Sequence, residues 1–105
     1  MDALIVYVTT PDEASAGLIA GALVEERLCA GATVLAGARS VFRWKGGTVR
    51  TAECVCLLLT NATNYPDLER RLKEMHPYEV PCIAALPVQS AYPPFLQWIE
   101  GETRS

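Results

Sequence analysis

The stretch VFRWKGGTVRTAECVCLLL, residues 41–59, has the pattern of a long β-hairpin and decides the fold. Apolar and β-branched side chains lie on both sides of the turn signal Lys45-Gly46-Gly47. Residues 30–60 as a whole therefore predict two extended segments around that turn. Gly37 predicts a bulge or bend in the first segment. Because the hairpin lies in the middle of the chain, the segments on either side determine which sheet it joins.

The segment before the hairpin predicts a strand followed by a helix. Residues 3–9, ALIVYVT, form a short apolar run typical of a central strand covered on both faces. The sequence TPDE then predicts a helix start, with Thr10 as the N-cap, Pro11 at the first helical position and Glu13 completing a capping box. We expect this helix to end near Leu28.

The segment after the hairpin predicts a helix, a strand and a second helix. Asn64–Met75 has apolar residues on one helical face, and Pro77 ends it. Residues 80–88 predict a strand, and residues 92–100 predict a short C-terminal helix. The order β-α-β-β-α-β-α predicts one α+β domain, residues 1–105, of the ferredoxin-like βαββαβ type with an extended central hairpin and a C-terminal helix.

The hairpin is long for the domain that carries it. An arm of roughly 14 extended residues at about 3.3 Å each would reach some 45 Å, whereas a 100-residue domain has a radius of gyration of about 13 Å. Such an arm exposes Phe42 and Trp44 together with unpaired strand edge, which pairing with other copies of the chain would cover. We therefore expect an oligomer with Phe42 and Trp44 at the interface. The alternative is a hairpin that bends at Gly37 and folds back on its own sheet.

Composition and charge exclude several classes of partner. Half of the 105 residues are apolar, a fifth are charged, and the net charge is −3. Without a broad basic field, nucleic acid and anionic membranes are not expected partners. The N-terminus lacks the features of a signal peptide, and no stretch approaches the ~18 apolar residues of a membrane span. We therefore expect a cytoplasmic protein with reduced cysteines.

One segment, His76-Pro77-Tyr78-Glu79-Val80-Pro81, suggests chemistry. His76 falls at the C-terminal end of a predicted helix, where the helix dipole favours the protonated ring. His76 is either a metal ligand or a cap for the last helix carbonyls, with Pro77 ending the helix, and local physics favours the cap. Tyr78 and Glu79 could bind a ligand or could be polar turn residues.

The cysteines leave two interpretations open. Cys54 and Cys56 are two residues apart on a predicted strand, so their thiols share a face, where paired soft ligands could hold Cu(I). The favoured alternative is burial as small apolar side chains in the core. Cys29 and Cys82 carry the same ambiguity.

Two other functions, RNA binding by the hairpin and acyl phosphate hydrolysis at the first loop, have little support in the sequence. The hairpin is locally basic, but no RNP1 pattern accompanies it, which favours a solvated strand edge over an RNA-binding face. Its basic residues are Arg39, Arg43, Lys45 and Arg50. An acylphosphatase-like enzyme would need an arginine-lined phosphate loop after the first strand, where this chain has Thr9-Thr10-Pro11-Asp12. We therefore expect no enzyme.

Several segments together carry a resemblance that spans the chain. They are VYVTTPDE (6–13), ALVEERLCAG (22–31), RSVFRW-K-G (39–46) and HPYEVPCIAALPV (76–88), followed by the aromatic helix around Trp98. They resemble the CutA family, the divalent-cation tolerance proteins. The resemblance implies a ferredoxin-like fold and a homotrimer joined through the long hairpins. It also implies a role in cation tolerance, with copper(II) as the metal usually associated and no established catalytic activity.

The resemblance leads to two site predictions and two functions. Copper(II) or another divalent cation is predicted to bind at His76 with help from Glu79 or Cys29, and no organic cofactor is expected. A ligand cleft between subunits is predicted near Tyr78 and Glu53. The alternative function is a trimeric signalling or scaffold protein whose clefts bind a small metabolite or a partner protein.

The chain departs from the family pattern at three single positions and in one segment, where Thr48-Val49-Arg50-Thr51 largely replaces an acidic stretch that is usual after the turn and leaves Glu53. The family typically has a cysteine and an asparagine in the strand after the first helix, where this chain has Gly31 and Thr33. It commonly has a lysine at the position of Leu59, before Thr60. His76, Tyr78 and Glu79 match the family, so the metal prediction rests on them and on Cys29, two residues from Gly31.

Overall fold

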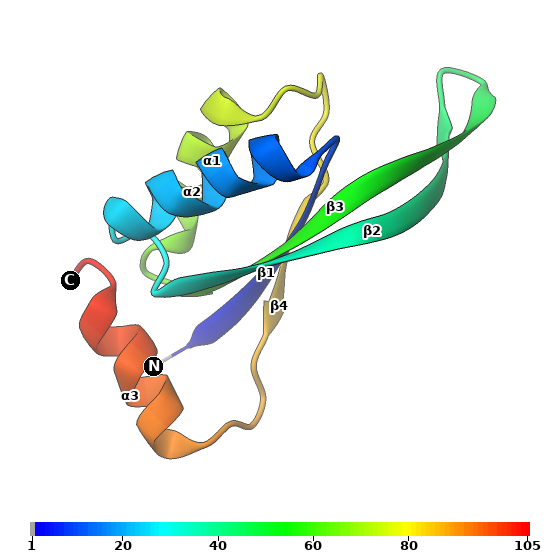
Figure 1. Ribbon diagram of the computed structural model, residues 1–105. Helices are drawn as coiled ribbons and strands as arrows, with labels where there is room; N and C mark the ends of the chain where they lie inside the picture. Colours follow the sequence, from blue (N-terminus) through cyan, green and yellow to red (C-terminus); the bar gives the residue numbers. More distant parts are fainter. Residues whose placement is uncertain (1) are drawn as a thin grey trace.

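The computed structural model describes residues 2–105 and contains one four-stranded antiparallel sheet and three helices (Figure 1). In chain order the elements are β1 (Ala3–Thr10), α1 (Glu13–Glu25), β2 (Gly31–Trp44), β3 (Gly47–Asn61), α2 (Tyr65–Met75), β4 (Ile83–Pro87) and α3 (Pro93–Glu102). The strand order is β2-β3-β1-β4. This is the ferredoxin-like arrangement predicted from the order of elements.

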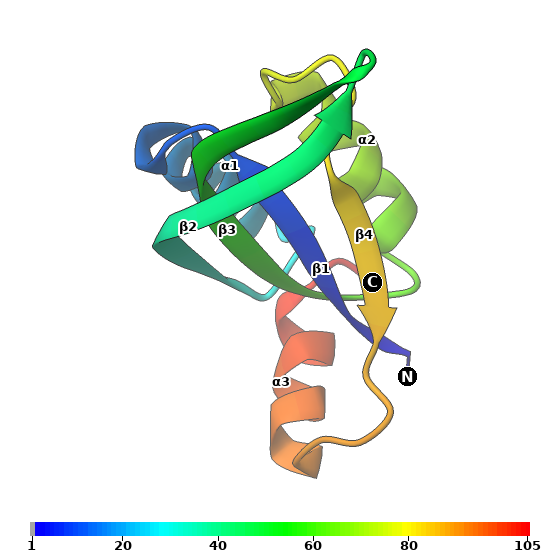
Figure 2. The same cartoon turned by 90° about the vertical axis from the view of Figure 1, so that its right-hand side faces the viewer.

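Helices cover the two faces of the sheet unequally (Figures 1 and 2). Helices α1 and α2 lie side by side on one face and bury alternate residues of β1 and β3, whereas α3 lies at one end of the sheet on the opposite side. The buried cluster consists of Val6, Val8, Ile19, Ala20, Leu23, Leu28, Cys29, Cys56, Leu58, Leu68 and Leu72. Most of the second sheet face therefore has no helix over it. Within residues 2–105, none of the helices is both long and apolar enough to cross a membrane.

The second sheet face, which we call the free sheet face, is nevertheless apolar. The paired residues Ile5–Leu59, Tyr7–Leu57 and Leu35–Val55 alternate with core residues along their strands, so they point away from α1 and α2. Leu35 and Leu86, at the two sides of this face, are 50% and 53% exposed. An apolar sheet face in water is the signature of a surface that another layer covers.

The start of α1 corrects the predicted cap. Asp12, not Thr10, is the N-cap: it has an extended backbone, and its carboxylate accepts a 2.7 Å hydrogen bond from the backbone N–H of Ser15. This bond lowers the pKa of the Asp12 carboxyl. The Thr10 hydroxyl instead donates to the backbone oxygen of Asp12, and Pro11 precedes the helix. Both Thr10 and Asp12 are good cap residues, and the helix begins at the later one.

The hairpin has the predicted length, turn and bulge. Trp44 pairs with Gly47, which leaves Lys45 and Gly46 as a two-residue turn with φ of 47° and 81°. Two such positive values are typical of a type I′ hairpin turn. The register shifts between Leu35 and Ala38, where Gly37 has a φ of 83°, so the predicted bulge is confirmed. The molecule is 43 Å along its longest axis, and the hairpin leaves the sheet as a curved arm (Figure 1).

The fourth strand is shorter than predicted. It runs over Ile83–Pro87 rather than residues 80–88, because residues 76–82 form an irregular loop that turns toward the hairpin. Pro81 has no backbone N–H and cannot join the ladder at this point. The shorter strand leaves Tyr78, Glu79 and Val80 free to contact the arm.

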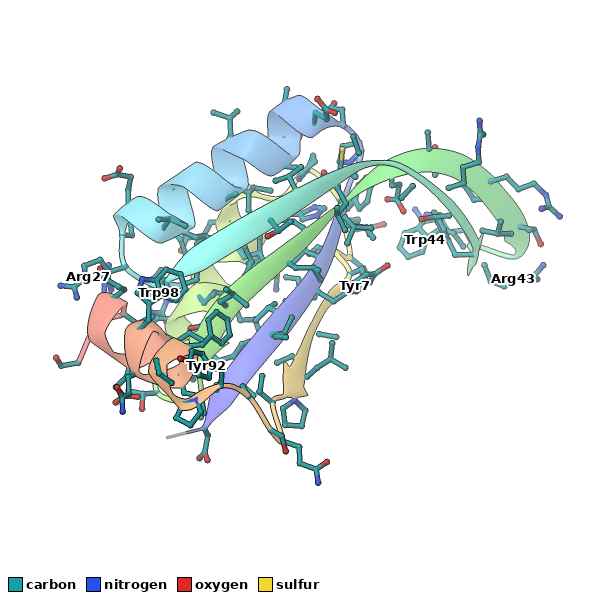
Figure 3. The ribbon with its side chains drawn as sticks, turned by 60° about the horizontal axis from the view of Figure 1, so that its bottom comes forward. Tyr7, Arg27, Arg43, Trp44, Tyr92 and Trp98 are labelled. Atoms are coloured by element: carbon teal, nitrogen blue, oxygen red, sulfur yellow. The ribbon has the colours of Figure 1, made fainter. Side chains whose placement is uncertain are left out.

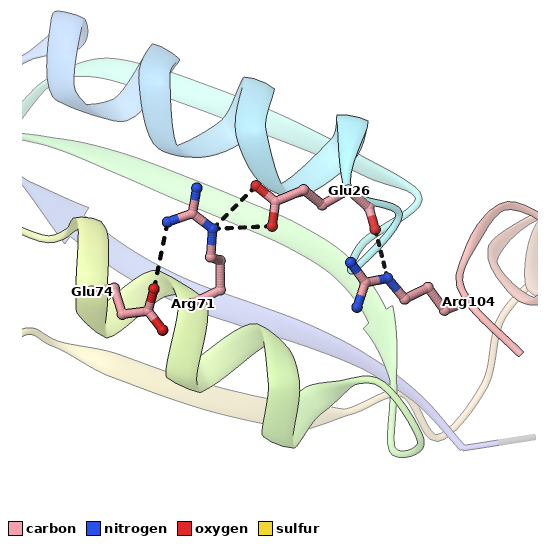
Figure 4. Close-up of polar contacts among 4 residues, drawn as sticks. All are labelled: Glu26, Arg71, Glu74 and Arg104. Atoms are coloured by element: carbon pink, nitrogen blue, oxygen red, sulfur yellow. Dashed lines mark hydrogen bonds and ion pairs between the residues drawn. The ribbon is translucent and has the colours of Figure 1, made fainter.

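Two arginines join the C-terminal segment to the end of α1: Arg27, which follows the helix, and Arg104, whose contact with Glu26 is drawn in Figure 4. Arg27 has a φ of 60°, and its guanidinium donates to the backbone oxygens of Gly101 and Glu102 at 2.8 and 3.1 Å. The Arg104 side chain donates to the backbone oxygen of Glu26 at 2.8 Å. The carboxylate of Glu26 also accepts two bonds from Arg71 of α2. These contacts join α1, α2 and the chain end, and so fix where α3 meets the sheet.

Candidate functional site

His76 lies between the end of α2 and the end of β1, and it is only 7% exposed. Its Nε2 is 2.8 Å from the backbone oxygen of Thr9, and its Nδ1 is 3.2 Å from the backbone nitrogen of Tyr78. A carbonyl only accepts and a backbone N–H only donates, so Nε2 carries the proton and Nδ1 accepts. The ring therefore links β1 to the following loop. His76 is also the C-cap of α2, as predicted, but through its backbone N–H, which donates a 2.9 Å hydrogen bond to the backbone oxygen of Leu72.

Both ring nitrogens are used in these two contacts, which bears on metal binding. A metal needs a free nitrogen lone pair, and the only lone pair of this tautomer accepts from Tyr78. The carboxylate of Glu79 is 3.4 Å from the Lys45 ammonium. Within residues 2–105, no three His, Cys, Asp or Glu side chains are grouped to hold a metal ion.

Cys29 lies far from His76 and is buried. The backbone of Ala30 bonds to Leu59, which pairs with Ile5, four residues along β1 from Thr9 and hence about 13 Å away. Burial raises the pKa of the Cys29 thiol to about 12, so it stays protonated at neutral pH. The residues of one chain thus do not fit a copper(II) site made of His76, Glu79 and Cys29. Such a site stays a prediction from the family resemblance.

The other cysteines follow the burial interpretation, with one exception. Cys54 and Cys56 do share a face, and both are buried against the helices, at 3% and 0% exposure. Burial raises the pKa of both thiols, to about 11 for Cys56. Cys82 is exposed in the loop before β4. The loop after β1 contains no arginine and ends in the capping carboxylate of Asp12, so it does not form a phosphate loop.

Tyr78 and Glu53, the predicted cleft residues, are in direct contact. The Tyr78 hydroxyl donates a 2.6 Å hydrogen bond to the Glu53 carboxylate, which is 5% exposed on β3. The Tyr78 ring lies 4.9 Å from the His76 ring, centroid to centroid. The loop after α2 is thus attached to β1 through His76 and to β3 through Tyr78. That these residues bind a ligand stays a prediction.

A pocket of about 350 Å³ lies between this loop and the inner side of the arm. It is lined by Phe42, Trp44, Val49, Thr51, Tyr78, Glu79 and Val80. Phe42 pairs with Val49 and Trp44 with Gly47, so these side chains share one face of the hairpin. Figure 3 shows Trp44 inside the curve of the arm and Arg43 near its outer end. The arm curves back far enough to meet the 78–80 loop of its own chain (Figure 1). The alternative prediction, a hairpin bent back on its own sheet, holds only for this contact.

The contact between arm and loop was missing from the sequence interpretation. Lys45 at the turn reaches both the Glu79 carboxylate, at 3.4 Å, and the Trp44 ring, at 5.5 Å from its centroid. The signal that could have found it was the two-residue alternation along the arm, which places Phe42 and Trp44 on a common face. What lies opposite that face depends on the curvature of the arm, which the sequence pattern does not specify.

The pKa of Tyr78 gives a first testable prediction. Burial and the bond to Glu53 raise it to about 12, whereas a free phenol ionises near pH 10. Stabilisation by this contact is therefore fully present below pH 10 and is lost as the pH rises toward 12. Tyr78→Phe should remove part of the tyrosinate absorbance that develops only near pH 12, and should weaken the fall in unfolding free energy over the same range.

Tyr65→Phe provides the matched control for this titration. Tyr65 donates to Glu69, and its pKa is also raised to about 12, but it lies on α2 away from the pocket. Each variant should remove a separate portion of the late absorbance. A Tyr78→Phe protein that instead loses absorbance near pH 10 would contradict the buried contact with Glu53.

Comparison with known proteins identifies the family. Residues 4–102 match the family model described as CutA1 divalent ion tolerance protein. This chain belongs to the CutA1 family. A divalent-cation tolerance protein CutA from Thermus thermophilus is 40% identical over 99 residues, which are 94% of this chain and 96% of the relative.

Solved CutA1 structures agree with the fold. The structure of the divalent cation tolerance protein (Cut A1) from Thermus thermophilus has a TM-score of 0.95 and 39% identity, covering 97% of this chain and 99% of the other. The structure described as the periplasmic divalent cation tolerance protein CutA from Archaeoglobus fulgidus has a TM-score of 0.91 and 29% identity, covering 95% and 97%. The resemblance seen in the sequence is thus confirmed.

The three single-residue departures from the family pattern, Gly31, Thr33 and Leu59, fall together in space. Gly31 pairs with Leu59 and Thr33 with Leu57, so all three positions lie on the free sheet face near α3. A Cβ atom at Gly31 would be 3.0 Å from Cη2 of Trp98, so the indole occupies the space that a cysteine side chain would need. The Trp98 ring is stacked with Phe95 at 5.9 Å. Glycine at position 31 therefore belongs with the packing of α3, not with the loop that contains His76.

Proposed function

We propose that this protein supports tolerance to divalent cations as a cytoplasmic homotrimer whose subunits join through the free sheet face and the hairpin arm. The observation that carries the assembly is the apolar free sheet face, with Leu35 and Leu86 half exposed at its two sides. The function itself follows from membership of the CutA1 family. Phe42 and Trp44, each 39% exposed, stay predicted interface residues.

Copper(II) is the cation that the family resemblance suggests, but we do not expect His76 to bind it. The ring of His76 is buried and both its nitrogens are bonded. Calorimetric titration of copper(II) into the assembled protein should therefore give the same stoichiometry for the parent and for His76→Ala. Loss of saturable binding in His76→Ala, with the oligomer intact, would restore the predicted metal site.

Growth under metal stress tests the proposed role. In a bacterial strain made sensitive to copper(II) by loss of its own CutA protein, this chain should restore growth, whereas an empty vector should not. Leu35→Asp, which places a carboxylate on the free sheet face, should fail to restore growth although the protein is present at normal levels. Full restoration by a monomeric Leu35→Asp protein would show that assembly is unnecessary.

A second function, capture of a small ligand, is favoured by one specific observation. The pocket between the arm and the 78–80 loop has a volume of about 350 Å³, which lies within the range of small-molecule sites. It adjoins the predicted cleft residues Tyr78 and Glu53. A thermal-shift panel of small ligands tests this function, and absence of any stabilisation would count against it.

A further inference from the structure

The pocket beside the arm has the side chains that recognise an organic cation. Three of its lining residues are aromatic, Phe42, Trp44 and Tyr78. Glu79 is its only ionisable lining residue apart from Tyr78. Aromatic faces attract cations through the ring quadrupole, and cages of such rings bind alkylated ammonium groups. A carboxylate at the rim adds Coulomb attraction for the same charge.

The chain already places one ammonium group at this position. Nζ of Lys45 lies 5.5 Å from the Trp44 ring centroid and 3.4 Å from the Glu79 carboxylate. These are the two contacts that a bound ammonium would make. The Lys45 and Glu79 side chains are 70% and 67% exposed, and ion pairs of such exposure contribute little stability. A ligand can therefore displace this lysine at small cost.

The turn that presents Lys45 is an unusual place for a lysine. Both central residues of a type I′ turn need positive φ, and asparagine or glycine is the preferred first residue. Lys45 nevertheless adopts a φ of 47°. From this backbone position the Lys45 ammonium reaches both Trp44 and Glu79.

The surroundings of the pocket disfavour an anionic ligand. The Glu53 carboxylate accepts a hydrogen bond from the Tyr78 hydroxyl. A second carboxylate therefore lies next to the aromatic lining of the pocket. The arginines of the hairpin alternate with the lining residues: Arg43 and Arg50 are on the opposite face of the ladder from Phe42 and Val49. The pocket thus has acidic and aromatic side chains, and Arg43 and Arg50 point away from it, which leaves Lys45 as the basic side chain of the arm that reaches it.

We propose that this pocket binds a small alkylammonium ligand, whose cationic group takes the place of the Lys45 ammonium between the Trp44 ring and the Glu79 carboxylate. This inference rests on the second proposed function, ligand capture, and names its ligand class. It does not depend on copper binding or on the cation-tolerance role, and it treats Phe42 and Trp44 as walls of a cleft that a neighbouring subunit borders and does not fill.

Isothermal titration of the assembled protein with choline tests the proposal. The neutral isostere 3,3-dimethylbutan-1-ol has the same shape without the charge, and sodium chloride at equal ionic strength controls for salt. Choline should bind saturably and at least about threefold more tightly than the alcohol, because only the charged group gains the ring and carboxylate attractions. Equal binding of the two would leave ligand capture standing and overturn the ligand class. Binding of neither would overturn the proposal, and ligand capture as such would then be decided by the thermal-shift panel.

Tryptophan emission shows whether choline reaches the arm. The chain has two tryptophans, Trp44 and Trp98, of similar exposure at 39% and 43%. In Trp98→Phe the remaining emission comes from Trp44 and should change on adding choline. In Trp44→Phe the emission comes from Trp98 and should not. A response from Trp98 alone would place the ligand at α3 and overturn the proposal.

Substitution of the competing lysine gives the sharpest test. Lys45→Asn suits the type I′ turn and removes the resident ammonium, so choline should bind about two- to fivefold more tightly. Arg50→Ala makes the same change in net charge on the opposite hairpin face and should leave choline binding unchanged. Glu79→Gln should weaken binding by a similar factor. If Lys45→Asn and Arg50→Ala raise the affinity for choline equally, the gain comes from net charge alone. That result would overturn the proposal that choline displaces the Lys45 ammonium.

Discussion

Leu35→Asp is expected to convert the assembled protein into monomers. Leu35 is 50% exposed in the single chain, so an aspartate there disturbs the isolated fold little. If a second copy covers the free sheet face, the same carboxylate is buried without a partner, which costs several kcal/mol at each interface. Static light scattering should therefore show three times the chain mass for the parent and one chain mass for the variant.

Leu18→Asp is the matched control for this prediction. Leu18 lies on α1 and is 73% exposed, on the side of the molecule away from the free sheet face. The same substitution there should leave the mass unchanged. Leu86→Asp, on β4 at the other side of the free sheet face, should dissociate the protein as Leu35→Asp does. Intact assemblies in both free-face variants, with normal circular dichroism, would remove the free sheet face from the interface.

The sequence predicted the fold well because its strongest signals are local. The type I′ turn at Lys45-Gly46, the bulge at Gly37 and the proline after α2 each depend on a few adjacent residues. The errors arose where two local solutions compete. Thr10 and Asp12 can both cap a helix, and Asp12 does so because Ser15 is the residue that its carboxylate reaches.

The candidate site was only partly predictable, because its contacts are between distant segments. Tyr78 and Glu53 were assigned to one predicted ligand cleft between subunits, but their direct hydrogen bond within one chain was not predicted. Nor was the bond of His76 to Thr9, which joins residues 67 positions apart. The closure of the pocket by Lys45 and Glu79 depends on how far the arm curves. Neither the partner of a buried ring nor the curvature of a hairpin follows from residue type and spacing.

The departures at Gly31, Thr33 and Leu59 are better understood from the structure than from the sequence. In the sequence they are single positions that differ from the family pattern, and the metal prediction rests on other residues. In the fold they form one patch under and beside Trp98, on the free sheet face. Their physical effect is therefore on how α3 and any neighbouring subunit pack against the sheet. The contacts around His76, Tyr78 and Glu79 do not involve these three positions.

His76→Ala is expected to destabilise the protein by about 2–4 kcal/mol, because it leaves two buried backbone groups without partners. The carbonyl of Thr9 loses its donor, the N–H of Tyr78 loses its acceptor, and each unsatisfied buried group costs about 1–3 kcal/mol. Urea unfolding at one fixed protein concentration measures the loss. A ring that served mainly as an exposed metal ligand would give almost no change in metal-free buffer.

Two conservative variants separate the contributions of the ring nitrogens. The amide oxygen of asparagine can take the position of Nδ1 and accept from Tyr78, so His76→Asn should recover part of the stability. The amide nitrogen of glutamine can take the position of Nε2 and donate to Thr9, so His76→Gln should recover another part. If both unfold as easily as His76→Ala, the ring contributes through its volume alone. Partial recovery in each would establish His76 as the residue that joins α2, β1 and the pocket loop, and would explain a histidine here without a bound metal.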